Sequence, residues 1–103
     1  MIEQTFKISI GNSRAIDKII NDENIHYNHV ILNKNEGLPE HITNSNVYVT
    51  IVKGILSITL NNQETHHYST GTVIKIPSDT KLMIENHHKS TLEVFILKAP
   101  APQ

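Results

Sequence analysis

The sequence predicts an all-β fold, an antiparallel sandwich or barrel, with one short helix near the N-terminus. From residue 26 onward the chain consists of short runs rich in β-branched and aromatic residues, separated by Gly, Pro, Asn and Asp. About nine such runs at this spacing are typical of sandwiches and barrels. Apolar residues at helical spacing occur in only one segment. A chain of 103 residues is expected to form a single domain, residues 1–103.

The first 24 residues are predicted to form a strand and then the helix. The strand, over residues 1–10, is indicated by apolar residues on alternate positions: Ile2, Phe6, Ile8 and Ile10. Ser13 is a suitable helix cap. The apolar face of the helix would be Ala15, Ile16, Ile19 and Ile20. Turn-forming residues at positions 21–24 end this helix.

Residues 25–98 are predicted to form the barrel, and residues 99–103 a proline-containing tail. The expected strands are 27–33, 41–43, 47–52, 55–60, 64–68, 71–76, 82–86 and 92–97. The segment 47–52 is β-branched or aromatic throughout, which is typical of a strand covered on both faces. In segment 55–60, Leu56, Ile58 and Leu60 are expected to face the core, while Ser57 and Thr59 face away.

The composition excludes several classes of function. The net charge is −1 and Lys and Arg are scattered, so we expect no nucleic-acid partner. The absence of cysteine removes disulfides, thiolate nucleophiles and cysteine-ligated zinc. No apolar run approaches the roughly 20 residues that span a membrane. The first ten residues include charged side chains, unlike a secretory signal, so we expect a cytoplasmic protein.

Two stretches, residues 36–54 and 71–86, resemble the paired motifs of the cupin superfamily. In the first motif a Gly/Pro bend, a histidine and a closing glycine are matched by Gly37, Pro39, His41 and Gly54. In the second motif the glycine, the turn proline and the final asparagine are matched by Gly71, Pro77 and Asn86. The resemblance covers residues 30–97. It implies a cupin-type jelly-roll β-barrel.

The metal-binding positions of these motifs are degenerate. In metal-bearing cupins, three histidines and a carboxylate hold the ion, but here only His41 matches a ligand. The other three positions are occupied by Thr43, Val47 and Leu82. Such a site needs several N or O donors aimed at one point, so we expect no metal cofactor. If a divalent metal is bound, the candidate ligands are His41 and, should it point inward from the preceding strand, His29.

Strand alternation predicts a pocket inside the barrel. If His41 and Thr43 point inward, their neighbours on the inner face are Val47 and Val49, and Leu82 and Ile84 face them from the opposite side. These six residues would form a mostly apolar pocket with a small polar patch, which suits a small molecule. The alternative is that the same side chains simply fill the core.

Three hypotheses for function follow from the resemblance. The first is a metal-independent cupin that binds a small molecule, and the second is a metal-dependent dioxygenase or isomerase with a non-standard ligand set that includes His41. The third is a metal-free acid–base enzyme like the sugar-epimerase cupins, in which His41 would act. A homodimer is also expected, because cupins commonly pair and because the apolar residues 1–10 have no obvious partner within the barrel.

Overall fold

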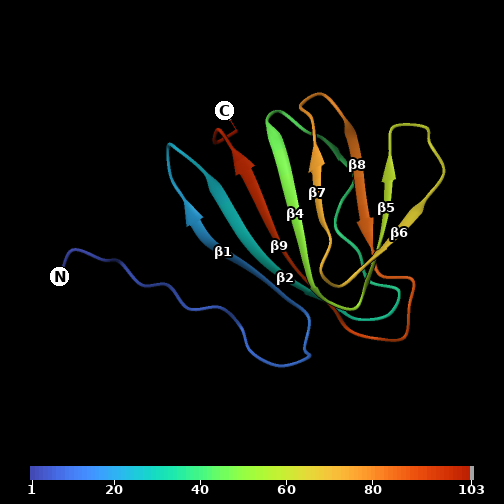
Figure 1. Ribbon diagram of the computed structural model, residues 1–103, viewed down its shortest axis with the longest axis horizontal. Coiled ribbons are helices and arrows are strands. Elements are labelled where there is room, and N and C mark those ends of the chain that lie inside the picture. The colour runs from blue at the N-terminus through green and yellow to red at the C-terminus, as the bar shows by residue number, and fades with distance from the viewer. Residues whose placement is uncertain (103) are drawn as a thin grey trace.

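Nine strands form two antiparallel sheets in the computed structural model, which describes residues 1–102 (Figure 1). The strands are β1 (Ala15–Asn21), β2 (His26–Leu32), β3 (His41–Ile42), β4 (Asn46–Lys53), β5 (Ile55–Leu60), β6 (His66–Ser69), β7 (Val73–Ile76), β8 (Lys81–Glu85) and β9 (Leu92–Ala99). The five-stranded sheet has the order β1-β2-β9-β4-β7, and the four-stranded sheet has the order β3-β8-β5-β6. None of residues 1–102 belongs to a helix that could cross a membrane.

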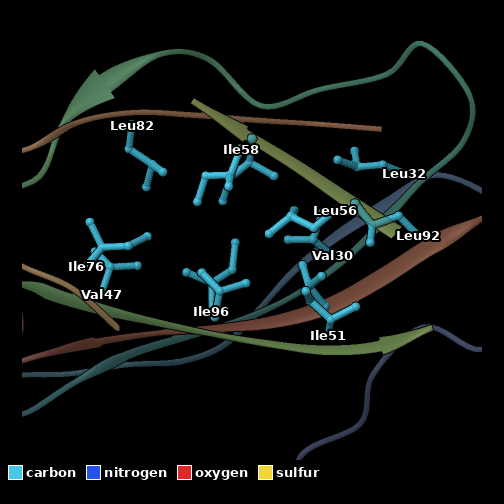
Figure 2. Packing of buried hydrophobic residues seen from close by; sticks show 13 residues of the cluster. Val30, Leu32, Val47, Ile51, Leu56, Ile58, Ile76, Leu82, Leu92 and Ile96 are labelled. Carbon is cyan, nitrogen blue, oxygen red and sulfur yellow. The ribbon is translucent and has the colours of Figure 1, made fainter. Parts of the chain in front are cut away.

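The hydrophobic core lies between the two sheets. Figure 2 shows Leu56, Ile58 and Leu82 of the four-stranded sheet facing Val47, Ile51 and Ile96 of the five-stranded sheet. Along β4, buried residues alternate with partly exposed ones, as expected for a strand with one face on the core. The core therefore forms from the side chains that the period of two places on the inner faces.

The prediction of a strand followed by a helix in residues 1–24 was wrong. The segment Ala15–Asn21 is the edge strand β1, paired with β2 from Ala15↔Ile31 to Asn21↔His26. Positions 15, 16, 19 and 20 fit a helical face, but they also fit a strand with an irregularity, and β1 has one between Lys18 and Ile20. A helix of this length is marginal by itself, whereas the free edge of β2 supplies partners for the backbone of β1. Pairing with β2 therefore determines the conformation of β1, and the local sequence pattern does not.

Residues 1–10 form an arm without strand pairing, so the strand predicted there is also absent from the described chain (Figure 1). The side chains of Met1, Ile2 and Ile10 are almost completely exposed. Near its end the arm is attached to β1, because the backbone amide and the hydroxyl of Ser9 both donate to the carboxylate of Asp17, at 2.7 and 2.8 Å. Alternation alone cannot specify a strand when no neighbouring strand is available.

The residues retained from the cupin motifs hold the bend between β2 and β3 against β8. The amide of Leu38 donates to Ile84 at 2.9 Å, and the amide of Asn86 donates to Glu36 at 2.9 Å. Gly37 passes so close to β8 that a Cβ atom there would lie 3.1 Å from the carbonyl oxygen of Ile84. Only glycine allows this approach without a shift of the backbone. The bend places the following residues at one end of the space between the sheets.

The buried side chain of Asn86 holds the end of β8 through hydrogen bonds to the backbone. Its side chain is fully buried, and its amide nitrogen donates to the carbonyl oxygens of Leu32 at 3.0 Å and Ser90 at 2.9 Å. Its amide oxygen accepts from the backbone N–H of His88 at 2.9 Å. One side chain therefore satisfies three backbone groups from both sides of a loop, which accounts for an asparagine at this position.

Candidate functional site

A cavity of about 320 Å³ lies between the two sheets, within the size range of small-molecule sites. Its walls come from strands β1, β2 and β9 on one side, and from β8 and the bend before β3 on the other. The lining residues are Ile16, Asn28, Val30, Leu38, Pro39, His41, Leu82, Ile84, Ile96 and Lys98. Seven of these ten are apolar, so the polar groups Asn28, His41 and Lys98 define the chemistry of the cavity.

Strand geometry explains which residues reach the cavity. On β2, Asn28 and Val30 line it, so the intervening His29 must point to the opposite face of the sheet. On β8, Leu82 and Ile84 line it by the same alternation. The regular strands therefore form the walls, and the glycine-dependent bend delivers the remaining side of the cavity.

His41 lies at the exposed edge of the cavity. Its Nδ1 is 3.3 Å from the carbonyl oxygen of Pro39. Because a carbonyl oxygen only accepts, Nδ1 carries the proton in this contact, and the Nε2 of the neutral ring is left as an acceptor. His41 can therefore offer one hydrogen-bond acceptor to a bound molecule.

Of the six residues predicted to form the pocket, the structure brings three together around the cavity: His41, Leu82 and Ile84. The other three, Thr43, Val47 and Val49, do not line it. Val47 and Val49 are fully buried in the core. Their side chains face inward as alternation predicts, but the opposite sheet covers them completely.

Thr43, at the position of the second motif histidine, has a structural role in this fold. Its hydroxyl donates to the carbonyl oxygen of Pro77 and accepts from the backbone N–H of Thr80, both at 3.0 Å. The backbone of Thr43 also bonds Asp79 and Thr80. The side chain is buried, so its hydrogen-bonding capacity is used by the turn between β7 and β8.

His29 lies apart from the cavity, on the outer face of the five-stranded sheet, so the structure does not bring it together with His41. Its Nδ1 is 2.8 Å from Asp17 and its Nε2 is 2.6 Å from Glu93. The imidazole is fully buried and packs on Phe95 at 4.9 Å between ring centres. Both carboxylate contacts are satisfied together only by a ring with a proton on each nitrogen.

The arm contributes to this cluster of His29, Asp17 and Glu93 through Ser9, which donates hydrogen bonds to Asp17. The backbone N–H of Ser9 is the largest cause of a lowered pKa at the Asp17 carboxyl, and the hydrogen bond from His29 is the second. The ionised form of Asp17 is therefore the one that holds the arm. Within residues 1–102, no group of three or more histidine, aspartate and glutamate side chains is arranged to hold a metal ion.

Besides Asn28, the sequence interpretation missed a further functional candidate, Lys98. It follows Leu92, Val94 and Ile96 by the same period of two and reaches the cavity from the end of β9. Burial lowers the pKa of the Lys98 amine, and the nearby positive charge of Lys18 lowers it further. The alternation of inward-facing residues along this strand continues in the sequence to Lys98, but the strand was expected to end at residue 97.

Two antiparallel sheets of this order, with a Gly/Pro bend at the edge of the cavity between them, define a double-stranded β-helix of the cupin type. No protein-family model matches the chain. It is 35% identical over 104 residues to the uncharacterized protein MJ0764 of Methanocaldococcus jannaschii, an alignment that covers 100% of this chain and 90% of that protein.

The crystal structure of the M. jannaschii protein, described as an RmlC-like cupin family protein with a double-stranded β-helix fold, superposes with a TM-score of 0.95 over 99% of this chain and 94% of the other. A cupin superfamily protein from Desulfitobacterium hafniense, 12% identical, has a TM-score of 0.76 and covers 90% of this chain and 83% of its own. The chain belongs to the RmlC-like cupin family.

Proposed function

We propose that this cupin binds a small molecule in the cavity between its sheets, without the metal centre typical of the family. The observation that carries the proposal is the cavity of about 320 Å³, apolar except for three polar residues. A concave, mostly apolar cavity with few directed polar groups is the usual form of a small-molecule site.

The substituted motif positions support the same proposal. The hydroxyl of Thr43 is committed to the turn at Pro77 and Thr80, while the side chains of Val47 and Leu82 carry no donor atom and pack in the core. Of the four motif positions only His41 keeps an imidazole at the cavity. A single imidazole provides too few donor atoms to bind a divalent ion tightly.

We further propose that the protein acts in the cytoplasm as a homodimer. The support for the dimer is the arm of residues 1–10, which has no strand partner in the described chain and exposes Met1, Ile2 and Ile10. A row of apolar side chains of this kind would be covered by a second copy. Light scattering at several protein concentrations tests the dimer.

A thermal-shift screen of the protein, purified without a histidine tag, tests ligand binding. A ligand that binds only the native state at 100 times its Kd stabilises by about 2.7 kcal/mol, equivalent to roughly 10–20 °C in a domain of this size. Organic acids, sugars and aromatic compounds should be compared at equal concentration. We expect at least one class to raise Tm.

A matched pair of variants locates the binding. Ile16 lines the cavity and is partly exposed, so Ile16→Trp should fill the cavity from its edge and abolish the ligand-induced shift. Ile42 is more exposed and does not line the cavity, so Ile42→Trp should retain the shift. Persistence of the shift in Ile16→Trp would contradict the proposal. So would stoichiometric metal that is lost in His41→Ala, an outcome that would favour a metal-dependent enzyme.

A further inference from the structure

The positively charged end of the cavity points to the chemical class of the ligand. We propose that the cavity binds a small carboxylate with an apolar body, whose anionic head is held between Lys98, Lys18 and Asn28. This inference rests on the proposed function, because it concerns the same cavity, and it adds the charge and the orientation of the ligand.

The register of the five-stranded sheet places the three polar residues on one face. Lys18 pairs with Asn28 across β1 and β2, and Ile16 pairs with Val30. Since Val30 and Asn28 line the cavity and directly paired residues point to the same side of a sheet, Lys18 lies on the cavity side too. Asn28 pairs with Ile96 on β9, and Lys98 is the next inward residue of that strand.

Two cations on this face have no carboxylate partner among residues 1–102. Among residues 1–102, the ion pairs that involve lysine or arginine join Arg14 to Glu36 and Lys81 to Glu40. Lys98 is partly buried, so its ammonium has lost some hydration without gaining a counter-charge. Lys18 repels it, and the lowered pKa of Lys98 records both effects. A carboxylate placed between them would offset both.

The rest of the cavity fits an apolar body. Across from the lysines, the walls are formed by Leu38, Leu82 and Ile84, which offer no hydrogen bonds. The side-chain amide of Asn28 can donate to a carboxylate oxygen. A neutral ligand would pack against the apolar walls, but it would leave the positive charges of the two ammonium groups uncompensated. A small inorganic anion would compensate the charges of the ammonium groups, but it would leave the apolar part of the cavity without a packing partner.

Paired probes that differ only in charge test the proposal. Benzoate and hexanoate should be compared with benzamide and hexanamide by calorimetric titration at near-neutral pH and low salt, with sodium chloride as the inorganic control. We expect each acid to bind at least tenfold more tightly than its amide. Hydrogen bonds to charged groups contribute about 1.5–3 kcal/mol, which corresponds to about 10- to 150-fold in Kd.

Variants of the lysines identify the groups responsible. Lys98→Met should weaken acid binding about 10- to 100-fold without a loss of Tm, because it removes a partly buried charge that has no partner. Lys98→Arg should retain binding. Lys18→Met, at an exposed position, should weaken acid binding by less than about fivefold. Lys75→Met is the matched control, since Lys75 lies over the ring of Tyr48 and does not line the cavity.

The outcomes separate this inference from the proposed function. Neutral compounds that bind in an Ile16→Trp-sensitive manner, with acids no tighter than amides, would overturn the carboxylate inference and leave ligand binding intact. Acid binding that is unchanged in Lys98→Met would also overturn it. If none of the acids binds at about 10 mM, where even a millimolar Kd is detected, the inference fails. Acid binding that is lost in both Ile16→Trp and Lys98→Met supports both.

Discussion

Replacement of Gly54 by alanine should destabilise the protein far more than the same change at Gly71. Gly54 joins β4 to β5, where the chain crosses from one sheet to the other. Its φ is 82°, and a Cβ atom there would lie 2.4 Å from the carbonyl oxygen of Thr91. Gly71 has a similar φ of 90°, but a Cβ atom there would meet nothing within 4 Å. Comparison of the two variants therefore separates the cost of the backbone conformation from the cost of the steric contact with Thr91.

The expected magnitudes follow from these two terms. A left-handed conformation costs a non-glycine residue about 1–2 kcal/mol, so Gly71→Ala should lose about that amount. Gly54→Ala adds an overpacking cost of about 1–3 kcal/mol, because Thr91 must move. The total is about 2–5 kcal/mol. The reduced freedom of alanine in the unfolded chain affects both variants alike and cancels from the comparison.

Urea unfolding followed by far-UV circular dichroism measures the difference. Loss of 1 kcal/mol corresponds to about 4–8 °C in Tm for a domain of this size, so a thermal melt should order the variants in the same way. Equal losses for the two variants would refute the reasoning, because they would mean that the approach to Thr91 contributes nothing.

Three further predictions concern the other contacts. Asn86→Ala leaves three backbone groups without their partner, one of them buried and two partly buried, and should cost about 2–5 kcal/mol in urea unfolding; a loss below about 1 kcal/mol would contradict the assigned role. Because the pKa of Asp17 is lowered in the folded state, its contribution is complete above the ordinary value of 3.8 and is lost as pH falls through the folded-state pKa. Amide exchange at Ser9 should lose its protection in that acid range, and protection that persists in the fully protonated protein would refute the link. Deletion of residues 1–8 should convert the proposed dimer to a monomer by light scattering, whereas an unchanged mass would exclude the arm from the interface.

Most of the fold could be predicted because the strands after residue 25 have two independent signals. In β4 the alternation of buried side chains agrees with strong β propensity, and turn-forming residues bound the strand on both sides. The N-terminal segment lacks this agreement. The apolar positions around Ile16 and Ile20 fit two periods, and the choice between them depends on the free edge of β2, which no local pattern encodes.

The candidate site could be predicted only in part, for a different reason. Alternation gives the side of a sheet on which a residue lies, but not how closely the opposite sheet approaches. Val49 and Ile84 both face inward, yet Val49 is sealed in the core and Ile84 lines the cavity. Lys98 was missed because the strand was expected to end at residue 97, whereas β9 continues to Ala99.

The positions that the cupin motif supplies and the positions that set the chemistry of this cavity are largely different. Gly37 allows a close approach of the backbone to β8, and Asn86 donates hydrogen bonds to the backbone of Leu32 and Ser90. Thr43, by contrast, occupies a ligand position of the motif and makes two hydrogen bonds to the β7–β8 turn. A histidine restored at residue 43 would break those bonds before it could meet a metal. The carboxylate selectivity that we propose for this cupin rests on residues outside the motifs, Lys18 and Lys98 on the cavity-facing side of β1 and β9.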